Sequence, residues 1–120
     1  MTETKLGVVE TRFAQIIWEN APLSSGELAR LAAEQLEWKK STTYTVLKKL
    51  CDRGLFANTK GTVTALISKE DFDGMQSEQF VEETFDGSLP AFLAAFTKRK
   101  QLSAEEVKKI RQMIDAYEEE

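Results

Sequence analysis

The sequence predicts a mainly helical, small α+β protein built in two parts, residues 1–68 and 69–120. Three observations support this prediction. Apolar residues recur at helical spacing through most of the chain, two short β-rich segments flank a Lys-Gly turn, and the charge changes sign near residue 68. With 120 residues, the chain is long enough for one small domain with a modest appendage.

The first two helices are predicted from spacing and from a capping pattern. Apolar residues within Val8–Trp18 form one stripe, and an Asn-Ala-Pro sequence ends that helix. Ser24 and Glu27 match a capping box, in which each side chain accepts a hydrogen bond from an unpaired backbone N–H. A second helix is therefore expected to begin at Ser24. Trp18 and Trp38 are expected to pack the first helix against the second and third.

A third helix is predicted from Ser41 or Thr42 to Asp52. Gly54 suits the left-handed conformation that commonly follows a helix end. The inward face is expected to contain Thr43, Val46, Leu47 and Leu50.

A β-hairpin is predicted directly after the third helix. Segments 55–58 and 63–68 flank the sequence Thr-Lys-Gly-Thr, and β-branched residues beside such a turn are typical of a hairpin. Three helices followed by a hairpin is the order of a winged helix-turn-helix. We therefore expect residues 1–68 to form a winged-helix domain.

The second half is predicted to be wholly helical. Helices are expected to about Phe85, over Leu89–Lys98, and from Ser103, which forms a second capping box with Glu106. Short amphipathic helices bury little surface alone, and a second copy of the chain is the simplest partner. We interpret residues 69–120 as a homodimerisation domain, with a ligand pocket among its phenylalanines as the alternative. The predicted dimerisation residues are Phe80, Phe85, Leu89, Phe92, Leu93, Phe96, Ile110 and Ile114.

The composition disfavours an enzyme, a metal site or a cofactor. The chain has no histidine, and Cys51 is its single cysteine, so the commonest general base and the usual zinc ligands are missing. We expect Cys51 to be a partly buried small side chain, with a thiol sensor as the alternative. No apolar run is long enough to cross a membrane, and residues 1–7 lack the apolar region of a signal peptide. A cytoplasmic location without membrane insertion is expected.

The charge distribution indicates a basic surface in the first part. The net charge of −4 divides into +2 for residues 1–68 and −6 for residues 69–120. The stretch 38–60 contains six Lys and Arg residues against a single acid, Asp52. An acidic protein still binds DNA when its positive charge is focused on one face. Double-stranded DNA is therefore the predicted partner.

The third helix is the predicted DNA-reading element, because its outward residues are small, polar or basic. Hydroxyl groups bind phosphates or base edges, and lysines supply charge to phosphates. The alternative is a winged-helix module that binds protein and not DNA. The predicted DNA-binding residues are Lys39, Lys40, Ser41, Thr42, Tyr44, Thr45, Lys48 and Lys49, with Lys60 and Thr62 in the hairpin.

The sequence resembles the penicillinase-repressor family, which includes the methicillin-resistance and copper-responsive repressors. The resemblance covers nearly the whole chain and depends on the order of several weak motifs. These are Ile-Ile-Trp at 16–18, Trp38 with the segment 42–55 ending in Arg-Gly-Leu, Phe-Asp-Gly-Ser-Leu at 85–89, and Gln-Leu-Ser-Ala-Glu-Glu-Val at 101–107.

This resemblance implies a homodimeric transcriptional repressor of the antibiotic-resistance regulator type, which binds a palindromic operator. It also implies a membrane-bound sensor protease that cuts between Asn and Phe in the fifth helix. The matching pair here is Ala95-Phe96, so the asparagine is absent, and the C-terminal cysteines of the copper-responsive branch are absent too. Lys40 replaces a proline that usually opens the recognition helix, which predicts a cap at Ser41.

Overall fold

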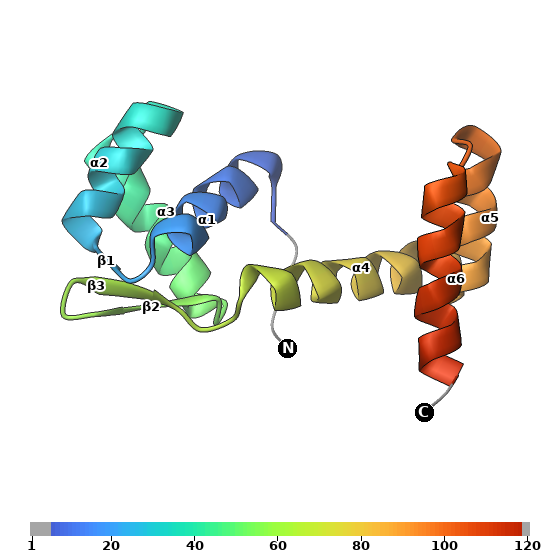
Figure 1. Ribbon diagram of the computed structural model, residues 1–120. Helices are drawn as coiled ribbons and strands as arrows, with labels where there is room; N and C mark the ends of the chain where they lie inside the picture. Colours follow the sequence, from blue (N-terminus) through green and yellow to red (C-terminus); the bar gives the residue numbers. More distant parts are fainter. Residues whose placement is uncertain (1–5, 119–120) are drawn as a thin grey trace. The chain divides into compact units, whose positions relative to one another are not determined.

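The computed structural model describes residues 6–118 and divides into two compact units. The first unit ends at Glu78 and the second begins at Gln79, so the boundary lies within one helix, α4. Residues 1–5 belong to the segment that is predicted to lack the apolar region of a signal peptide, and they lie outside the described residues. In chain order the elements are α1 (Val8–Asn20), β1 (Leu23–Ser24), α2 (Ser25–Leu36), α3 (Lys40–Asp52), β2 (Phe56–Thr59), β3 (Thr62–Ala65), α4 (Lys69–Phe85), α5 (Leu89–Arg99) and α6 (Ala104–Glu118) (Figure 1).

The first unit contains the hydrophobic core. Helices α1, α2 and α3 pack together over the small sheet, and the start of α4 adds Phe72 to the same core. The ring of Phe13 on α1 lies 4.9 Å from that of Trp38, which precedes α3. This arrangement confirms the predicted winged helix-turn-helix class. The fully buried large side chains are Phe13, Ile17, Leu28, Thr43, Leu47, Leu50, Leu55, Phe56, Val63 and Phe72.

Helix α2 has the predicted N-terminal cap, but only one half of the predicted capping box. The Ser24 hydroxyl oxygen accepts a hydrogen bond from the Glu27 backbone N–H at 3.0 Å. The Glu27 carboxylate does not complete the box, because it forms an ion pair with Arg30 on the next turn.

Helix α3 begins at Lys40, one residue before the earlier of the two predicted starts, Ser41. Its N-cap is Lys39 and not Ser41, because the Lys39 carbonyl already accepts the first helical hydrogen bond, from Thr43 N–H at 3.1 Å. Lys40 therefore occupies the first helical position, where proline is also favoured. At the other end Gly54 has φ = 84°, as predicted, and Leu55 N–H donates to the Leu50 carbonyl at 3.1 Å, the arrangement of a Schellman motif.

The sheet has one strand more than predicted. The hairpin of β2 and β3 is confirmed, and its turn residues Lys60 and Gly61 both have positive φ, 52° and 84°, as a type I′ hairpin turn requires. Strand β1 pairs antiparallel with β3, giving the order β1-β3-β2. The Ser25 N–H also donates to the Gly61 carbonyl at 2.8 Å, which holds the hairpin against the start of α2.

Trp18 joins α1 to different elements from those predicted. Its ring centroid lies 5.3 Å from Phe56 on β2 and 5.3 Å from Phe72 on α4. Its indole N–H donates to the Ile67 carbonyl at 2.9 Å. Trp18 therefore fixes the hairpin and the start of α4 to the first helix, which no local sequence pattern indicated.

The second unit is helical, as predicted, but poorly buried on its own. The Ser103–Glu106 capping box is complete, with hydrogen bonds of 2.9 and 3.1 Å. Phe80, Phe85 and Phe92 form edge-to-face contacts with centroids 5.7–6.1 Å apart. Among the described side chains from 79 to 117, none is fully buried. The apolar faces of these helices are thus only partly covered within one chain.

Candidate nucleic-acid interface

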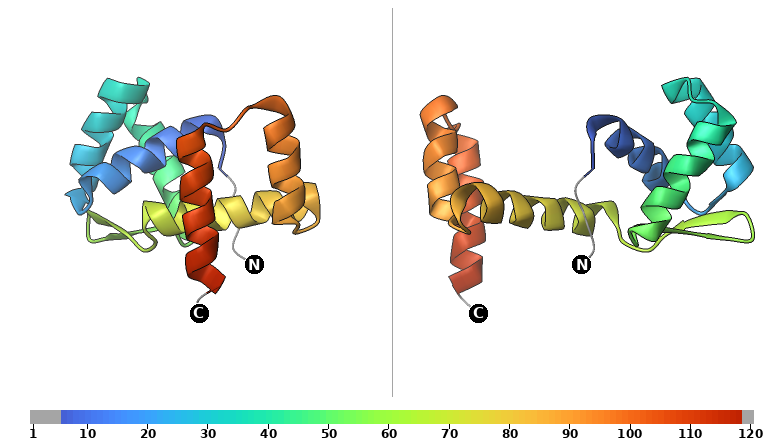
Figure 2. Two further views of the ribbon diagram at one scale, coloured as in Figure 1. Left: turned by 45° about the vertical axis from the view of Figure 1, so that its right-hand side comes forward. Right: turned by 180° about the vertical axis from the view of Figure 1, so that it is seen from behind.

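Helix α3 presents one exposed polar face. Ser41, Thr45 and Lys48 lie at successive turns on this face, opposite the buried Thr43 and the two core leucines of the helix. Seen from behind in the right-hand view of Figure 2, α3 (green) lies on the near side of the first unit, with the hairpin extending beside it. The face is therefore available to a large partner.

The threonine hydroxyls of α3 are oriented by the helix backbone. The Thr45 hydroxyl donates to the Ser41 carbonyl at 2.9 Å, and that of buried Thr43 donates to the Lys39 carbonyl at 3.3 Å. Because its proton is already used, the exposed Thr45 oxygen is left as an acceptor beside an exposed methyl group. Such a side chain suits the amino groups of adenine or cytosine and the methyl group of thymine.

The start of α3 carries two exposed lysines. Lys39 and Lys40 are both exposed, and the Lys40 ammonium lies 6.0 Å from the ring centroid of Tyr44. Tyr44 itself is half-buried and packs against the core, so it is less outward than the sequence predicted. Thr42 is exposed on the same turn. The first turn of the helix is thus basic and polar without an acidic residue.

The two lysines near the end of α3 have different partners. The Lys48 ammonium lies 3.1 Å from the Asp52 carboxylate within the helix. The Lys49 ammonium lies 3.0 Å from the carboxylate of Glu10 on α1. Glu10 also accepts from the Gly7 N–H at 3.0 Å, and this bond, followed by Lys49, lowers the pKa of the Glu10 carboxyl. The sequence did not indicate this link between α1 and α3.

The hairpin places two further predicted residues on the surface of the first unit. Lys60 is exposed in the turn, and Thr62 is exposed at the start of β3. Because β1 and the Ser25–Gly61 hydrogen bond hold the hairpin, its tip has a defined position relative to α2. The hairpin therefore presents the positive charge of Lys60 on a backbone that is held in place, in addition to the lysines of α3.

Cys51 is half-buried in the last turn of α3, in the position that the sequence predicted. Burial, and then the nearby Asp52 carboxylate, raise the pKa of its thiol. A raised pKa disfavours the reactive thiolate, so the thiol-sensor alternative gains no support.

The predicted dimerisation residues are exposed or half-buried side chains of the second unit. Phe80, Leu89, Phe96 and Ile114 are exposed, although Phe96 also contacts Phe92 at 6.0 Å. The half-buried members of the set are Phe85, Phe92, Leu93 and Ile110. Ala95 and Phe96 are both exposed within α5.

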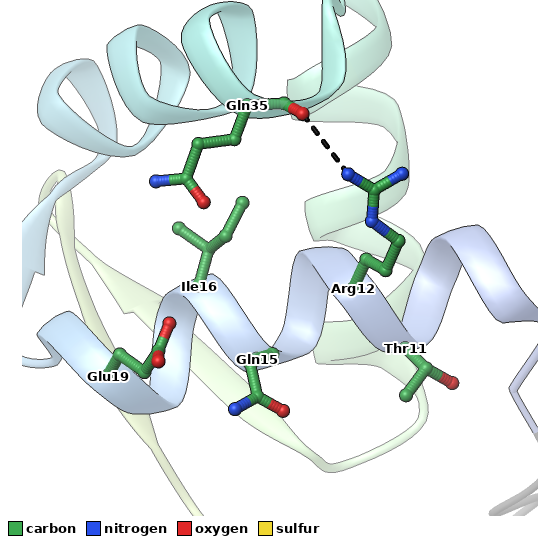
Figure 3. A pocket seen from close by; sticks show the side chains of 6 residues that line it. All are labelled: Thr11, Arg12, Gln15, Ile16, Glu19 and Gln35. Atoms are coloured by element: carbon green, nitrogen blue, oxygen red, sulfur yellow. Dashed lines mark hydrogen bonds between the residues drawn. The ribbon is translucent and has the colours of Figure 1, made fainter.

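A shallow cavity of about 270 Å³ lies between α1 and α2, at a place that no sequence motif indicated. Figure 3 shows Arg12 donating to the backbone carbonyl of Gln35 across it, at 3.3 Å. Ile16 forms its apolar part. The remaining lining side chains are Thr11, Gln15 and Glu19.

Two kinds of feature were not found in the described residues. Within 6–118, no helix combines the length and the low polarity needed to cross a lipid bilayer. The same part of the chain has no group of three or more acidic or cysteine side chains gathered as metal ligands.

Comparison with known proteins gives one consistent result. The sequence profile of the penicillinase repressor family matches residues 6–116, which includes both units. The penicillinase repressor of Bacillus licheniformis is 24% identical over 112 residues, a match that covers 90% of this chain and 88% of that protein. Together with the exposed polar face of α3 beside a fixed hairpin, this match shows that the chain belongs to the penicillinase repressor family of DNA-binding transcriptional repressors, which are not enzymes.

Proposed function

We propose that this repressor acts as a homodimer that places α3 of each copy in successive major grooves of a palindromic operator. A two-fold dimer matches a palindrome when its reading helices lie about 34–36 Å apart. The observation that supports the dimer is the absence of any fully buried side chain among the described residues 79–117. A helical unit of this size needs more buried apolar surface to be stable, and a second copy supplies it.

Base reading is assigned to Thr42 and Thr45, and phosphate contacts to four exposed lysines other than Lys49. The N-terminal residues of a recognition helix meet the base edges, and both threonines lie in the first half of α3 with exposed side chains. Lys39, Lys40, Lys48 and Lys60 supply the positive charge that makes binding sensitive to salt. Phosphate contacts through their hydroxyl groups are also assigned to Ser41 and Thr62, because both side chains are exposed.

The test of this function is a DNA-binding series with the full chain. Duplexes selected from a random pool identify the operator, and binding is then measured against salt by fluorescence anisotropy. Thr45→Val is expected to change the preferred sequence while leaving the salt dependence intact, because it removes the hydroxyl acceptor and no charge. Absence of salt-sensitive binding would support the protein-interaction alternative instead.

The regulated gene is proposed to be of the antibiotic-resistance type, because the related Bacillus protein is named a penicillinase repressor. A cytoplasmic location follows from access to chromosomal DNA. The test is to find the selected operator sequence upstream of a resistance gene in the source genome. Its occurrence only upstream of unrelated genes would contradict this proposal.

A membrane-bound sensor protease is the further partner that the family resemblance implies. Ala95-Phe96 lies within α5, so cleavage there requires that helix to open locally. Co-expression with such a protease and mass analysis of the fragments tests the proposal. An Ala95→Asn variant is the matched control, since it restores the asparagine of the cleavage pair.

A further inference from the structure

The neighbouring lysines of α3 differ in what their ion pairs connect. Lys48 pairs with Asp52 inside the same helix, and both side chains are well exposed, at 78% and 66%. Lys49 pairs with Glu10 on α1, where the two side chains are 53% and 21% exposed. The first pair stays within one helix, whereas the second pair joins two helices.

Glu10 is held in place from both sides. Its carboxylate accepts from the Gly7 N–H at 3.0 Å and so caps the first turn of α1, and it receives Lys49 at 3.0 Å. A carboxylate fixed by a backbone hydrogen bond is a defined anchor for a cation. Lys49 therefore ties the last turns of α3 to the capped start of α1.

The two lysines consequently respond differently to a phosphate. Lys48 can exchange Asp52 for a phosphate without changing any contact between helices, because Asp52 lies on α3 as well. If Lys49 turned to a phosphate, Glu10 would lose its ion-pair partner and keep only the weaker electrostatic effect of Arg53, and the pair between Lys49 on α3 and Glu10 on α1 would be broken. The negative charge of Glu10 would then also oppose a nearby phosphate.

We propose that Lys49 is a positioning residue for DNA recognition, which sets the orientation of α3 through Glu10, while Lys48 supplies the phosphate contact. This inference rests on the proposed role of α3 as the DNA-reading helix. A tilted α3 meets base edges poorly but still meets phosphates. Loss of the Lys49–Glu10 pair therefore lowers the preference for the operator more than it lowers general affinity for DNA.

The experiment compares three single variants of the full chain, K49Q, E10Q and K48Q. Each is titrated with the selected operator duplex and with an unrelated duplex of equal length, over a range of salt concentrations. The glutamine in E10Q keeps an oxygen that accepts the Gly7 N–H, so this variant removes the charge while preserving the cap. Thermal melts identify a temperature at which all variants are folded.

The expected results separate the roles of the two lysines. K48Q reduces the salt slope by about 0.9, the contribution of one phosphate contact. K49Q and E10Q leave the slope unchanged, and each lowers the ratio of operator affinity to unrelated affinity by up to about fivefold, the scale of a partly exposed ion pair. The double variant E10Q/K49Q shows no further loss, because both changes break the same pair.

Two results overturn the assignment. A slope reduced by about 0.9 in K49Q identifies Lys49 as a phosphate ligand. An unchanged affinity ratio in both K49Q and E10Q shows that the pair does not orient α3, whatever it adds to stability. The K48Q arm keeps the two proposals distinct, since an unchanged slope in that variant counts against α3 as the DNA-reading helix.

Discussion

Replacement of Ile114 by alanine is expected to weaken the proposed homodimer strongly. Ile114 lies on α6 with 51% of its surface exposed. Covering the exposed half of an isoleucine side chain is worth about 1–2 kcal/mol at ~25 cal/mol per Å² of apolar area. A two-fold interface uses the residue twice, so the dimer loses about 2–4 kcal/mol, or roughly 30-fold to 1000-fold in its dissociation constant.

Sedimentation equilibrium over a concentration series measures this constant directly. The matched control is Leu66→Ala in the first unit, because Leu66 is 62% exposed but lies outside the proposed interface. The control variant is expected to dimerise like the wild type, and far-ultraviolet circular dichroism checks that both variants keep their helices. Equal dissociation constants for the Ile114 variant and the wild type would refute the assignment of α6 to the interface.

Three further predictions concern the first unit. Trp18→Phe is expected to lower the free energy of unfolding, measured by urea denaturation, by about 1–3 kcal/mol, because the Ile67 carbonyl loses its indole donor. An unchanged free energy would mean that water replaces this donor. Gly54→Ala is expected to lower the free energy of unfolding by about 1 kcal/mol, because alanine is strained at the φ of 84°. Gly74→Ala within α4 is expected to be neutral or stabilising, since alanine favours a helix and neither added methyl group meets an atom within 4 Å. Equal effects of the two substitutions would contradict this conformational argument. Cys51 is expected to react with iodoacetamide more slowly than free cysteine at pH 8, because burial raises the pKa of its thiol; a faster reaction would revive the sensor hypothesis.

Local chemistry explains why much of the fold could be predicted from the sequence. Ser103 and Glu106 form the predicted capping box because both partners lie within one helical turn. Gly54 ends α3 because the left-handed conformation favours a residue without a side chain. Gly61 meets the same requirement in the hairpin turn, with φ = 84°, beside Lys60 at φ = 52°. In each case the interacting groups are neighbours in sequence, so spacing alone carries the information.

Long-range contacts could not be predicted in this way. Strand β1 is two residues long and exists because β3, nearly forty residues later, lies beside it. The ring contacts of Trp18 are with Phe56 and Phe72, which lie outside the helices that the sequence suggested. Neither pairing leaves a periodic signal in the chain.

In the candidate nucleic-acid interface, too, local features could be predicted from the sequence and long-range contacts could not. Composition and helical spacing are local properties, so the sequence predicts the basic first half, the hydroxyls and lysines of the third helix, and the amphipathic helices of the second half. The pairing of Lys49 with Glu10 on α1, and of Lys48 with Asp52 on its own helix, becomes visible only once the helices are packed. The partner of a surface lysine depends on which helix packs beside it, and packing is settled by the whole core and not by neighbouring residues.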